Sequence, residues 1–378
     1  MNTCNFIDIQ LCLLQYICDK YLTFPDIKNL RQVNKKCYRI KVKNFNGVSN
    51  KIIEKLDNDI LSNYPYLVKL YASYNPKITD INHLKYLEIL DVYANSGISD
   101  ESIKDLVDIV ELIALNNPKI TNVNHMKKIR SLDVRDDCGI NDEGIKDLVN
   151  VERLYASYNQ KITNINHMKN LRILYAFEYC GINDEGIRYL ENLEELHMPY
   201  NNKIGNINYL QKLKVLHIEG NCIIKNEDIS NLVNLEILNI HNNKMITNIN
   251  HMKKLKTLFA GFTCILGDDG IKELFNIEQL YIRNNKNITS LNHMKNLLYL
   301  DASWDCGLSN DGVKDLVNMR ELDVNDNEKI TNINHMVNLE YLNACNDSGI
   351  SDEGIKNIVN LEICADENPK ITRDKISK

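Results

Sequence analysis

The sequence predicts an α/β solenoid with a curved parallel sheet on its concave face and short helices or 3-10 turns outside. Similar segments recur with a constant period, and seven periods separate Leu67 from Leu361 without an insertion or deletion. Each period splits into a short half, such as 67–86, and a slightly longer half, such as 129–150. Fifteen such halves fill residues 67–378, and the last is truncated.

Each half begins with alternating apolar residues, which predicts a short, half-buried strand. In the first half these residues are Leu67, Leu70 and Ala72. The long halves continue with a polar, turn-prone Asn-Asp-Glu-Gly stretch and an apolar pair, such as Ile145 and Leu148. This order predicts a helical or 3-10 return on the outer side. Because each half buries its apolar side chains only against its neighbours, the two ends of the array need caps.

The repeats resemble the leucine-rich-repeat pattern, LxxLxLxxN or LxxLxLxxC followed by a second apolar set, over Leu67 to Lys378. The long halves are similar to the cysteine-containing subclass found in F-box leucine-rich-repeat proteins, and the chain resembles leucine-rich-repeat proteins of giant DNA viruses. One difference is that the periodic cysteines occur one place later: Cys138, Cys180, Cys222, Cys264 and Cys306. The resemblance implies a protein-binding adaptor and not an enzyme.

Residues 1–45 differ from the repeat and have the apolar spacing of short amphipathic helices. The segment from Tyr21 to Ile40 resembles the F-box, which implies docking on a Skp-type adaptor of a cullin ubiquitin ligase. The adaptor-binding residues would be Leu14, Ile17, Leu22, Ile27, Leu30 and Val33. The alternative is a plain helical cap on the solenoid. Residues 46–66 are expected to form a helical connector that covers the first repeat.

The bulk properties narrow the function classes. A net charge of -6 argues against a nucleic-acid partner, which usually requires a concentrated basic surface. We find neither an export signal nor a stretch of about 18 apolar residues, so we expect no membrane contact. The expected location is the cytoplasm or nucleus, or the host-cell cytoplasm if the protein is viral. Eleven cysteines in such a chain are expected to be reduced thiols.

The periodic histidines, cysteines and acidic pairs are interpreted as structural, and no metal or cofactor is expected. Equivalent atoms two halves apart are separated by about 10 Å, because neighbouring strands are about 4.8 Å apart. This distance is too long for direct chelation within a row and too long for a disulfide. No catalytic triad, phosphate-binding loop or zinc spacing occurs, and His, Cys and acidic clusters either follow the period or stand alone.

Repeats differ most at strand positions that alternate with the core, and these positions should project from the concave face. Aromatic and arginine side chains, which are enriched at binding hot spots, gather there. The predicted partner-binding residues are Tyr71, Tyr93, Arg135, Tyr155, Tyr175, Phe177, His197, Phe259, Tyr281, Arg283 and Trp304. Two functions follow as hypotheses: a substrate receptor of an SCF-type ubiquitin ligase that binds its target on this face, or a stand-alone binding scaffold.

Overall fold

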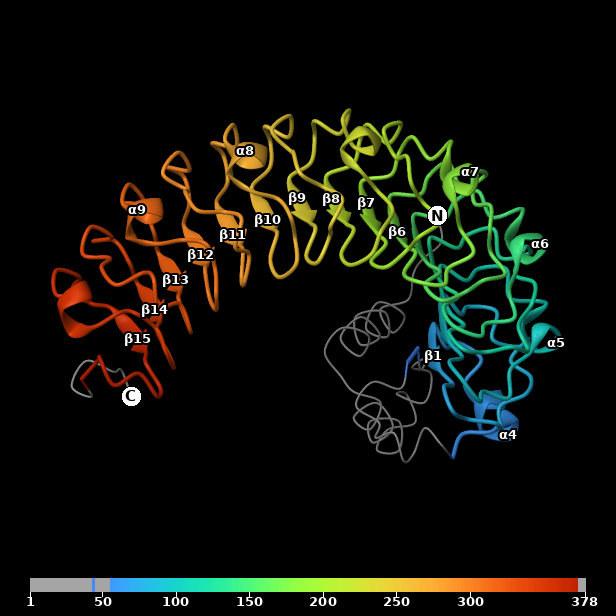
Figure 1. Cartoon of the computed structure of the whole chain (residues 1–378). Coiled ribbons are helices and arrows are strands. Elements are labelled where there is room, and N and C mark those ends of the chain that lie inside the picture. The colour runs from blue at the N-terminus through green and yellow to red at the C-terminus, as the bar shows by residue number, and fades with distance from the viewer. Residues whose placement is uncertain (1–42, 45–54, 373–378) are drawn as a thin grey trace, which may run out of the picture. The chain divides into compact units, whose positions relative to one another are not determined.

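The computed structural model describes residues 43–44 and 55–372 (Figure 1). These residues belong to two compact units, which we describe separately. The N-terminal unit comprises the described residues up to Leu171 together with Tyr179–Gly181, and the C-terminal unit comprises 172–178 and the described residues from Ile182 onward. The predicted F-box-like segment 1–45 lies outside the described residues apart from 43–44, as do all six of its predicted adaptor-binding residues.

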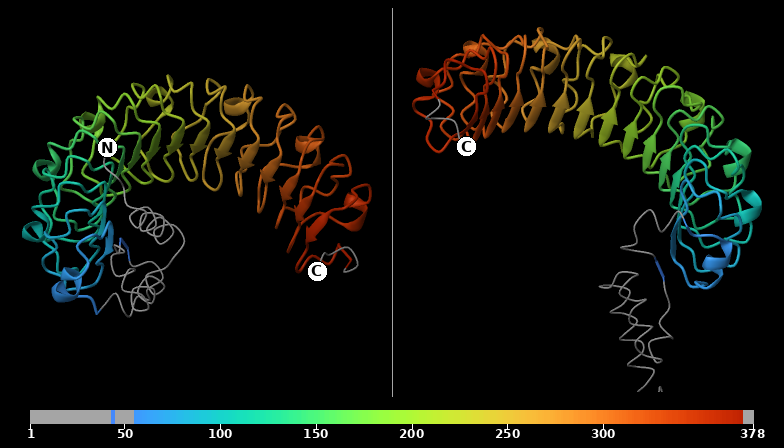
Figure 2. Two further views of the ribbon diagram at one scale, coloured as in Figure 1. Left: turned by 180° about the vertical axis from the view of Figure 1, so that it is seen from behind. Right: turned by 90° about the horizontal axis from the view of Figure 1, so that it is seen from below.

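Parallel three-residue strands follow one another in chain order within each unit. The strands of the N-terminal unit are β1 (Lys69–Tyr71), β2 (Ile89–Asp91), β3 (Glu111–Ile113), β4 (Ser131–Asp133) and β5 (Arg153–Tyr155). Those of the C-terminal unit are β6 (Ile173–Tyr175), β7 (Glu195–His197), β8 (Val215–His217), β9 (Ile237–Asn239), β10 (Thr257–Phe259), β11 (Gln279–Tyr281), β12 (Tyr299–Asp301), β13 (Glu321–Asp323), β14 (Tyr341–Asn343) and β15 (Glu362–Cys364). In Figure 2 the strands of the C-terminal unit lie side by side and point the same way. The predicted parallel sheet is therefore confirmed within each unit.

The strand starts reproduce the two halves of the period. From β1 to β14 a shorter and a longer step alternate, as in the steps from Lys69 to Ile89 and from Ile89 to Glu111, whereas β15 starts one position earlier than the longer step would place it. The middle residue of each strand points into the core and is at most 4% exposed. Ile363 fills this position in β15, in register with Leu342. The shorter last spacing therefore leaves the alternation of β15 unchanged, with Ile363 and Ala365 in the core.

Each long half carries a short helix on the side opposite to the strands (Figure 1). These elements are α5 (Asp100–Ile103), α6 (Asp142–Ile145), α7 (Asp184–Ile187), η2 (Asn226–Asp228), α8 (Asp268–Ile271), α9 (Asn310–Val313) and η3 (Asp352–Ile355). In α6 the side chain of Asn141 accepts a hydrogen bond from the Gly144 amide and caps the first turn. The longest helix in residues 55–372, α4 (Asn58–Ser62), has five residues, so this part of the chain contains no membrane-spanning helix.

The acidic start of these helices has a role that the sequence analysis did not foresee. The Asp142 carboxylate accepts hydrogen bonds from the Thr163 amide at 2.7 Å and the Thr163 hydroxyl at 2.6 Å, in the next repeat. Asp268 makes the same pair of bonds to Thr289. The first acidic residue therefore joins neighbouring repeats, in addition to its favourable place at a helix N-terminus.

The periodic histidines have structural contacts, as predicted. The Nε2 atoms of His125, His167, His251, His293 and His335 each lie 2.9–3.0 Å from a backbone carbonyl oxygen of the preceding repeat. The periodic cysteines, Cys138, Cys180, Cys222, Cys264 and Cys306, are at most 3% exposed. Burial raises the pKa of the Cys138 thiol to about 11 and that of Cys222 to about 12. These cysteines are therefore core residues with unreactive thiols.

The predicted connector contains one short helix among its described residues. Helix α4 covers only Asn58–Ser62, and residues 46–54 of the predicted connector lie outside the described residues. Leu56 and Leu61 are buried. The Asn75 amide of the first repeat donates to the Leu56 carbonyl at 2.9 Å. The connector thus packs on the first repeat with a shorter helix than expected.

Candidate functional site

We call the exposed side of the sheet the strand face. In each repeat it is formed by the first and third residues of the strand and by the residue two positions after the strand. These positions alternate with core residues, so their side chains lie on the opposite side of the sheet. Six predicted binding residues occupy the third strand position: Tyr71, Tyr155, Tyr175, His197, Phe259 and Tyr281. Four occupy the position two residues after the strand: Tyr93, Arg135, Phe177 and Arg283.

Trp304 is placed differently from the prediction. It lies three positions after the end of β12, at a turn where its φ is 61°, and not at an alternating strand position. Tyr74, Tyr158, Tyr200 and Phe262 occupy the same turn position and also have positive φ. Bulky residues rarely adopt this left-handed conformation. At Trp304 it is held by a backbone hydrogen bond from its amide to the Asn325 carbonyl at 2.7 Å.

The strand face of the N-terminal unit carries two separate groups of predicted residues. Tyr93 meets the Tyr74 ring edge to face, with ring centroids 4.9 Å apart. Arg135 pairs with Asp133 at 2.6 Å, and its guanidinium carbon lies 5.7 Å from the centre of the Tyr155 ring. The arginine charge is thus already balanced by Asp133, which makes this group largely self-satisfied.

On the strand face of the C-terminal unit, aromatic rings stack from strand to strand. Tyr175 of β6 stacks on His197 of β7 with centroids 4.1 Å apart, and His197 stacks on His217 of β8 at 4.5 Å. Farther along, Phe259 stacks on Tyr281 at 4.3 Å, and Tyr281 contacts Tyr299 at 4.7 Å. Neighbouring third positions are close enough for such contacts because the strands pair in register.

Arg283 joins the second of these stacks to the neighbouring turn. Its guanidinium carbon lies 4.0 Å from the centre of the Trp304 ring and 5.9 Å from that of Phe262. Trp304 is 40% exposed. It borders a hollow of about 270 Å³ lined also by Asp305, Asp326, Asn327, Glu328 and Lys329. Aromatic and cationic side chains therefore lie together at the edge of the strand face.

Carboxylates border the second stack. Asp301 accepts hydrogen bonds from Ser303, and Asp323 accepts one from the Asn343 amide at 2.9 Å. Burial, followed by the Asp301 charge, raises the pKa of Asp323 above its usual value. Burial and the Asp301 charge also raise the pKa of Tyr281 and Tyr299. Asp301, Glu321 and Asp323 thus gather three carboxylates on the strand face of β12 and β13.

His197 is the central ring of the first stack, and 13% of its side chain is exposed. Burial, followed by the charge of His217, lowers its pKa to about 4. The ring is therefore neutral at pH 7, and the 3.6 Å approach of its Nε2 to Glu195 is not an ion pair there. Its Nε2 has no hydrogen-bond partner among the described residues.

Because the folded pKa of His197 lies below the unfolded value, acid is expected to destabilise the protein through this residue. The unfolded chain takes up a proton near pH 6.5 and the folded ring only near pH 4, so stability is lost as the pH falls through this window. His197→Phe retains an aromatic ring and should reduce the loss by about 1–3 kcal/mol. Urea unfolding at neutral pH and at about pH 4.5 measures this loss of stability in each protein. Tyr281→Phe is the control and should leave the loss unchanged; an unchanged loss in His197→Phe would contradict the assignment.

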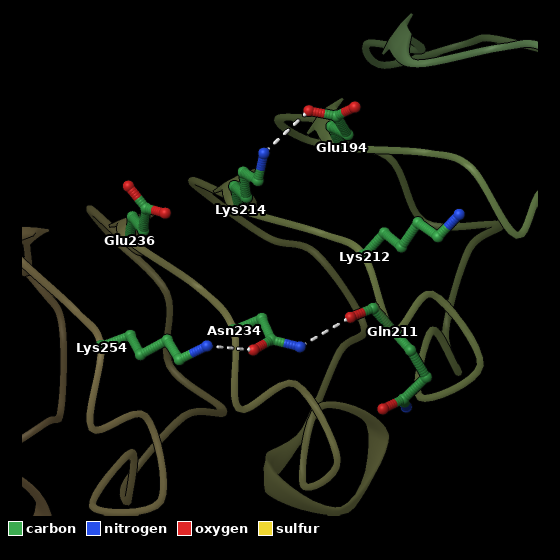
Figure 3. A pocket seen from close by; sticks show the side chains of 7 residues that line it. All are labelled: Glu194, Gln211, Lys212, Lys214, Asn234, Glu236 and Lys254. Atoms are coloured by element: carbon green, nitrogen blue, oxygen red, sulfur yellow. Dashed lines mark hydrogen bonds and ion pairs between the residues drawn. The ribbon is translucent and has the colours of Figure 1, made fainter.

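A second hollow lies beside the strand starts of β7 to β10 and not on the strand face. It has a volume of about 260 Å³ and is lined by Glu194, Gln211, Lys212, Lys214, Asn234, Glu236 and Lys254 (Figure 3). Glu194 accepts hydrogen bonds from Arg172 and Lys214, which lower its pKa to about 2. Within the lining, Glu194 pairs with Lys214, and Asn234 bonds to both Gln211 and Lys254.

Sequence reasoning missed three kinds of residue on the strand face. Tyr299 and Tyr341 occupy the first strand position, which the same alternation around Leu300 and Leu342 would have identified. Asp323 was missed because only aromatic and arginine residues were sought. Finally, the expectation that clusters follow the period or stand alone is wrong for one group: Cys345, Cys364 and Asp366 lie together, with one ligand atom from each within 4.8 Å of the others.

In each of the two compact units, the repeats combine a short strand, a buried Asn or Cys and an outer return. These features define a leucine-rich-repeat solenoid. The chain is similar to a leucine-rich-repeat protein of Leptospira interrogans, with 19% identity, a TM-score of 0.52, and coverage of 82% of this chain and 98% of that one. The functional domain of InlJ from Listeria monocytogenes, described as including a cysteine ladder, gives 18% identity and a TM-score of 0.49, with 80% of this chain covered. This chain spans 64% of that structure.

An internalin, InlF, from Listeria monocytogenes is 20% identical with a TM-score of 0.42, and the match covers 94% of this chain and 92% of that one. The chain matches no protein-family model and no curated protein sequence. The likeness to the Leptospira protein supports the leucine-rich-repeat fold.

Proposed function

We propose that the protein is a non-enzymatic scaffold that binds a basic segment of another protein on the strand face of its C-terminal unit. The observation that carries this proposal is the run of stacked aromatic rings bordered by carboxylates. Aromatic side chains contribute large contact areas at the centres of protein interfaces. They also attract the cationic groups of lysine and arginine through the faces of their rings.

The charge of the strand face specifies the partner. Along β6 to β15 its positions carry one cationic side chain, Arg283, among the described residues. The same positions carry seven carboxylates, from Glu195, Glu219, Asp301, Glu321, Asp323, Glu362 and Asp366. A basic partner complements this potential, whereas a nucleic acid would be repelled.

The contact between Arg283 and Trp304 is an internal example of the expected recognition. The guanidinium lies over the indole ring at 4.0 Å while Lys286 and Lys329 pair with Asp305 close by. A lysine or arginine of the partner would find the same two kinds of group, aromatic rings and a carboxylate, around Tyr281, Tyr299 and Asp301. Burial of such a pair strengthens both interactions because water is excluded.

An array of extended synthetic peptides tests the proposal with the full chain as probe. Each basic peptide is matched by one in which Glu and Asp replace Lys and Arg. We expect the wild-type chain to bind the basic set, and the double variant Tyr281→Ala, Asp323→Asn to bind it at least about tenfold more weakly, as is usual for interface anchors.

A matched control removes one aromatic ring and one carboxylate from the outer side. Phe275 is 56% exposed there, and the Asp269 carboxylate is fully exposed, so Phe275→Ala with Asp269→Asn should leave binding unchanged. Equal binding of the basic and acidic peptides would contradict the charge argument. Equal losses in the two double variants would contradict the choice of face.

A more specific hypothesis adds a role in ubiquitin ligation. Its support is the F-box resemblance of Tyr21–Ile40, which would dock a Skp-type adaptor and cullin complex while the repeats hold the target. This version places the protein in the cytoplasm or nucleus, or in the host-cell cytoplasm if it is viral. Without adaptor docking, the protein is a stand-alone scaffold.

Co-purification of the full chain with a Skp-type adaptor distinguishes the two versions. We expect stoichiometric binding that is abolished by Leu22→Asp and Ile27→Asp, while the basic peptides of the array still bind. Absence of adaptor binding by the folded wild-type chain would reject the ubiquitin-ligase version and leave the scaffold proposal standing.

A further inference from the structure

Two cysteines of the C-terminal unit differ from the periodic ones in their place in the fold. Cys364 is the third residue of β15, and Cys345 lies two positions after β14, so both belong to the strand face. Both are partly exposed, whereas the five periodic cysteines are buried. Asp366, two positions after β15, also belongs to this face and is exposed.

The three side chains converge between the last two described strands. The Sγ atoms of Cys345 and Cys364 are 3.0 Å apart, which is longer than a disulfide bond of about 2.05 Å and close for two separate thiols. One oxygen of Asp366 and the two sulfurs all lie within 4.8 Å of one another. Ligands at about 2.0–2.3 Å from a tetrahedral zinc ion are about 3.3–3.8 Å apart, so small side-chain rotations bring all three atoms into range.

The register of β15 places two residues of this cluster on the strand face. Ile363 and Ala365 take the core positions that Leu322 and Val324 hold one period earlier. Cys364 therefore has the outward third position of its strand, and Asp366 the outward position two residues after it. Cys364 pairs in register with Asn343 of the neighbouring strand, two positions before Cys345.

The surroundings favour a cation. Asp323 pairs in register with Asn343, whose neighbour on the other side is Cys364, and Glu362 is the first residue of β15. Two further carboxylates therefore lie on the strands around the cluster. Asn343, in register with Cys364, has an amide oxygen that lacks a hydrogen-bond partner among the described residues. Such an oxygen can accept a hydrogen bond from a water molecule on a bound metal ion.

We propose that Cys345, Cys364 and Asp366 form a binding site for a thiophilic divalent cation, with Zn²⁺ as the best fit to two sulfurs and one oxygen. Thiolate ligands select zinc over magnesium or calcium, which prefer sites made only of oxygen. The ion would join β14 to β15 at the point where the period shortens. It would stabilise the last repeat, whose strand has only one neighbouring strand among the described residues.

Titration of the reduced full chain with ZnCl₂, followed by calorimetry, tests the site. Cys345→Ser with Cys364→Ser should bind one Zn²⁺ fewer per chain than the wild type, and Asp366→Asn should weaken that site at least about tenfold. Cys264→Ala, in the buried row, is the control and should retain the wild-type stoichiometry. Zinc that still binds the double serine variant belongs to other residues.

The same samples give two further readouts. Cd²⁺ should produce a thiolate charge-transfer absorption in the wild type that decreases in the double serine variant, and Zn²⁺ should raise the melting temperature of the wild type more than that of Asp366→Asn. Equal zinc stoichiometry in the wild type and the folded double variant overturns the proposal. A Cys345–Cys364 disulfide that forms in air and persists with Zn²⁺ and a mild thiol reductant present also overturns it.

Discussion

Asn285→Leu is expected to lower the free energy of unfolding by about 2–5 kcal/mol, because it leaves buried backbone groups without partners. Asn285 is fully buried. Its side-chain nitrogen donates to the carbonyls of Ala260 at 2.7 Å and Leu266 at 3.2 Å, in the preceding repeat, and its oxygen accepts from the Asn287 amide at 2.8 Å. Leucine has a similar volume but makes none of these bonds.

Urea unfolding followed by circular dichroism measures this loss. Asn296→Leu is the control, since Asn296 is exposed and its amide makes a hydrogen bond to Phe275 at the surface. It should cost less than about 1 kcal/mol. Similar losses in the two variants would show that the buried amide has no special role. The same position in other short halves is also a buried Asn, including Asn159 and Asn201, so equivalent variants should behave alike.

The second large effect is expected at Gly312, the third residue of α9. A Cβ atom there would lie 2.1 Å from the Thr289 carbonyl oxygen, which is backbone and cannot rotate away. Gly312→Val therefore forces neighbouring repeats apart, including the 2.8 Å hydrogen bond from the Leu291 amide to the Gly312 carbonyl. We expect a loss of at least about 3 kcal/mol in the free energy of unfolding.

The chain contains its own control for this prediction. Ser102 occupies the equivalent place in α5, where its hydroxyl donates to the Thr79 carbonyl at 2.6 Å and accepts from the Ser99 amide at 3.0 Å. The matching bond between repeats, from Ile81 to Ser102, is 3.3 Å long. A serine is thus tolerated with a small opening and two new hydrogen bonds.

Gly312→Ser should therefore cost less than half as much as Gly312→Val in the same unfolding measurement, since Ser309 offers the amide that Ser99 offers in α5. Equal costs would mean that loss of chain flexibility, and not the contact with Thr289, determines the effect.

Much of the fold follows from the sequence for local reasons. The alternation around Leu280 predicts a strand, and the Asn-Asp-Glu-Gly stretch before Ile145 predicts the helical return that α6 forms. Repeat-to-repeat spacing also predicted a structural role for the histidine row, and contacts such as that of His167 with the Ile145 carbonyl agree with it. These features depend on the repeat period and on the spacing of apolar residues, and both can be read from the sequence.

The candidate site was predicted less completely. Third-position residues such as His197 and Tyr281 lie on the strand face, but Trp304 occupies a left-handed turn, because each strand is so short that it ends before this position. Which rings stack depends on the register between neighbouring strands. That register brings Tyr281 against both Phe259 and Tyr299, although Tyr299 is at a different strand position.

The sequence by itself determined the repeat, the side of the sheet that faces the core, and the structural role of the periodic His and Cys residues. Each of these follows from residue spacing, because side-chain direction in a strand alternates with a period of two. Only the tertiary structure decided which side chains meet across neighbouring repeats. The cluster of Cys345, Cys364 and Asp366 shows why: two of these residues lie in or just after β15, the third follows β14, and the register between the two strands brings them together.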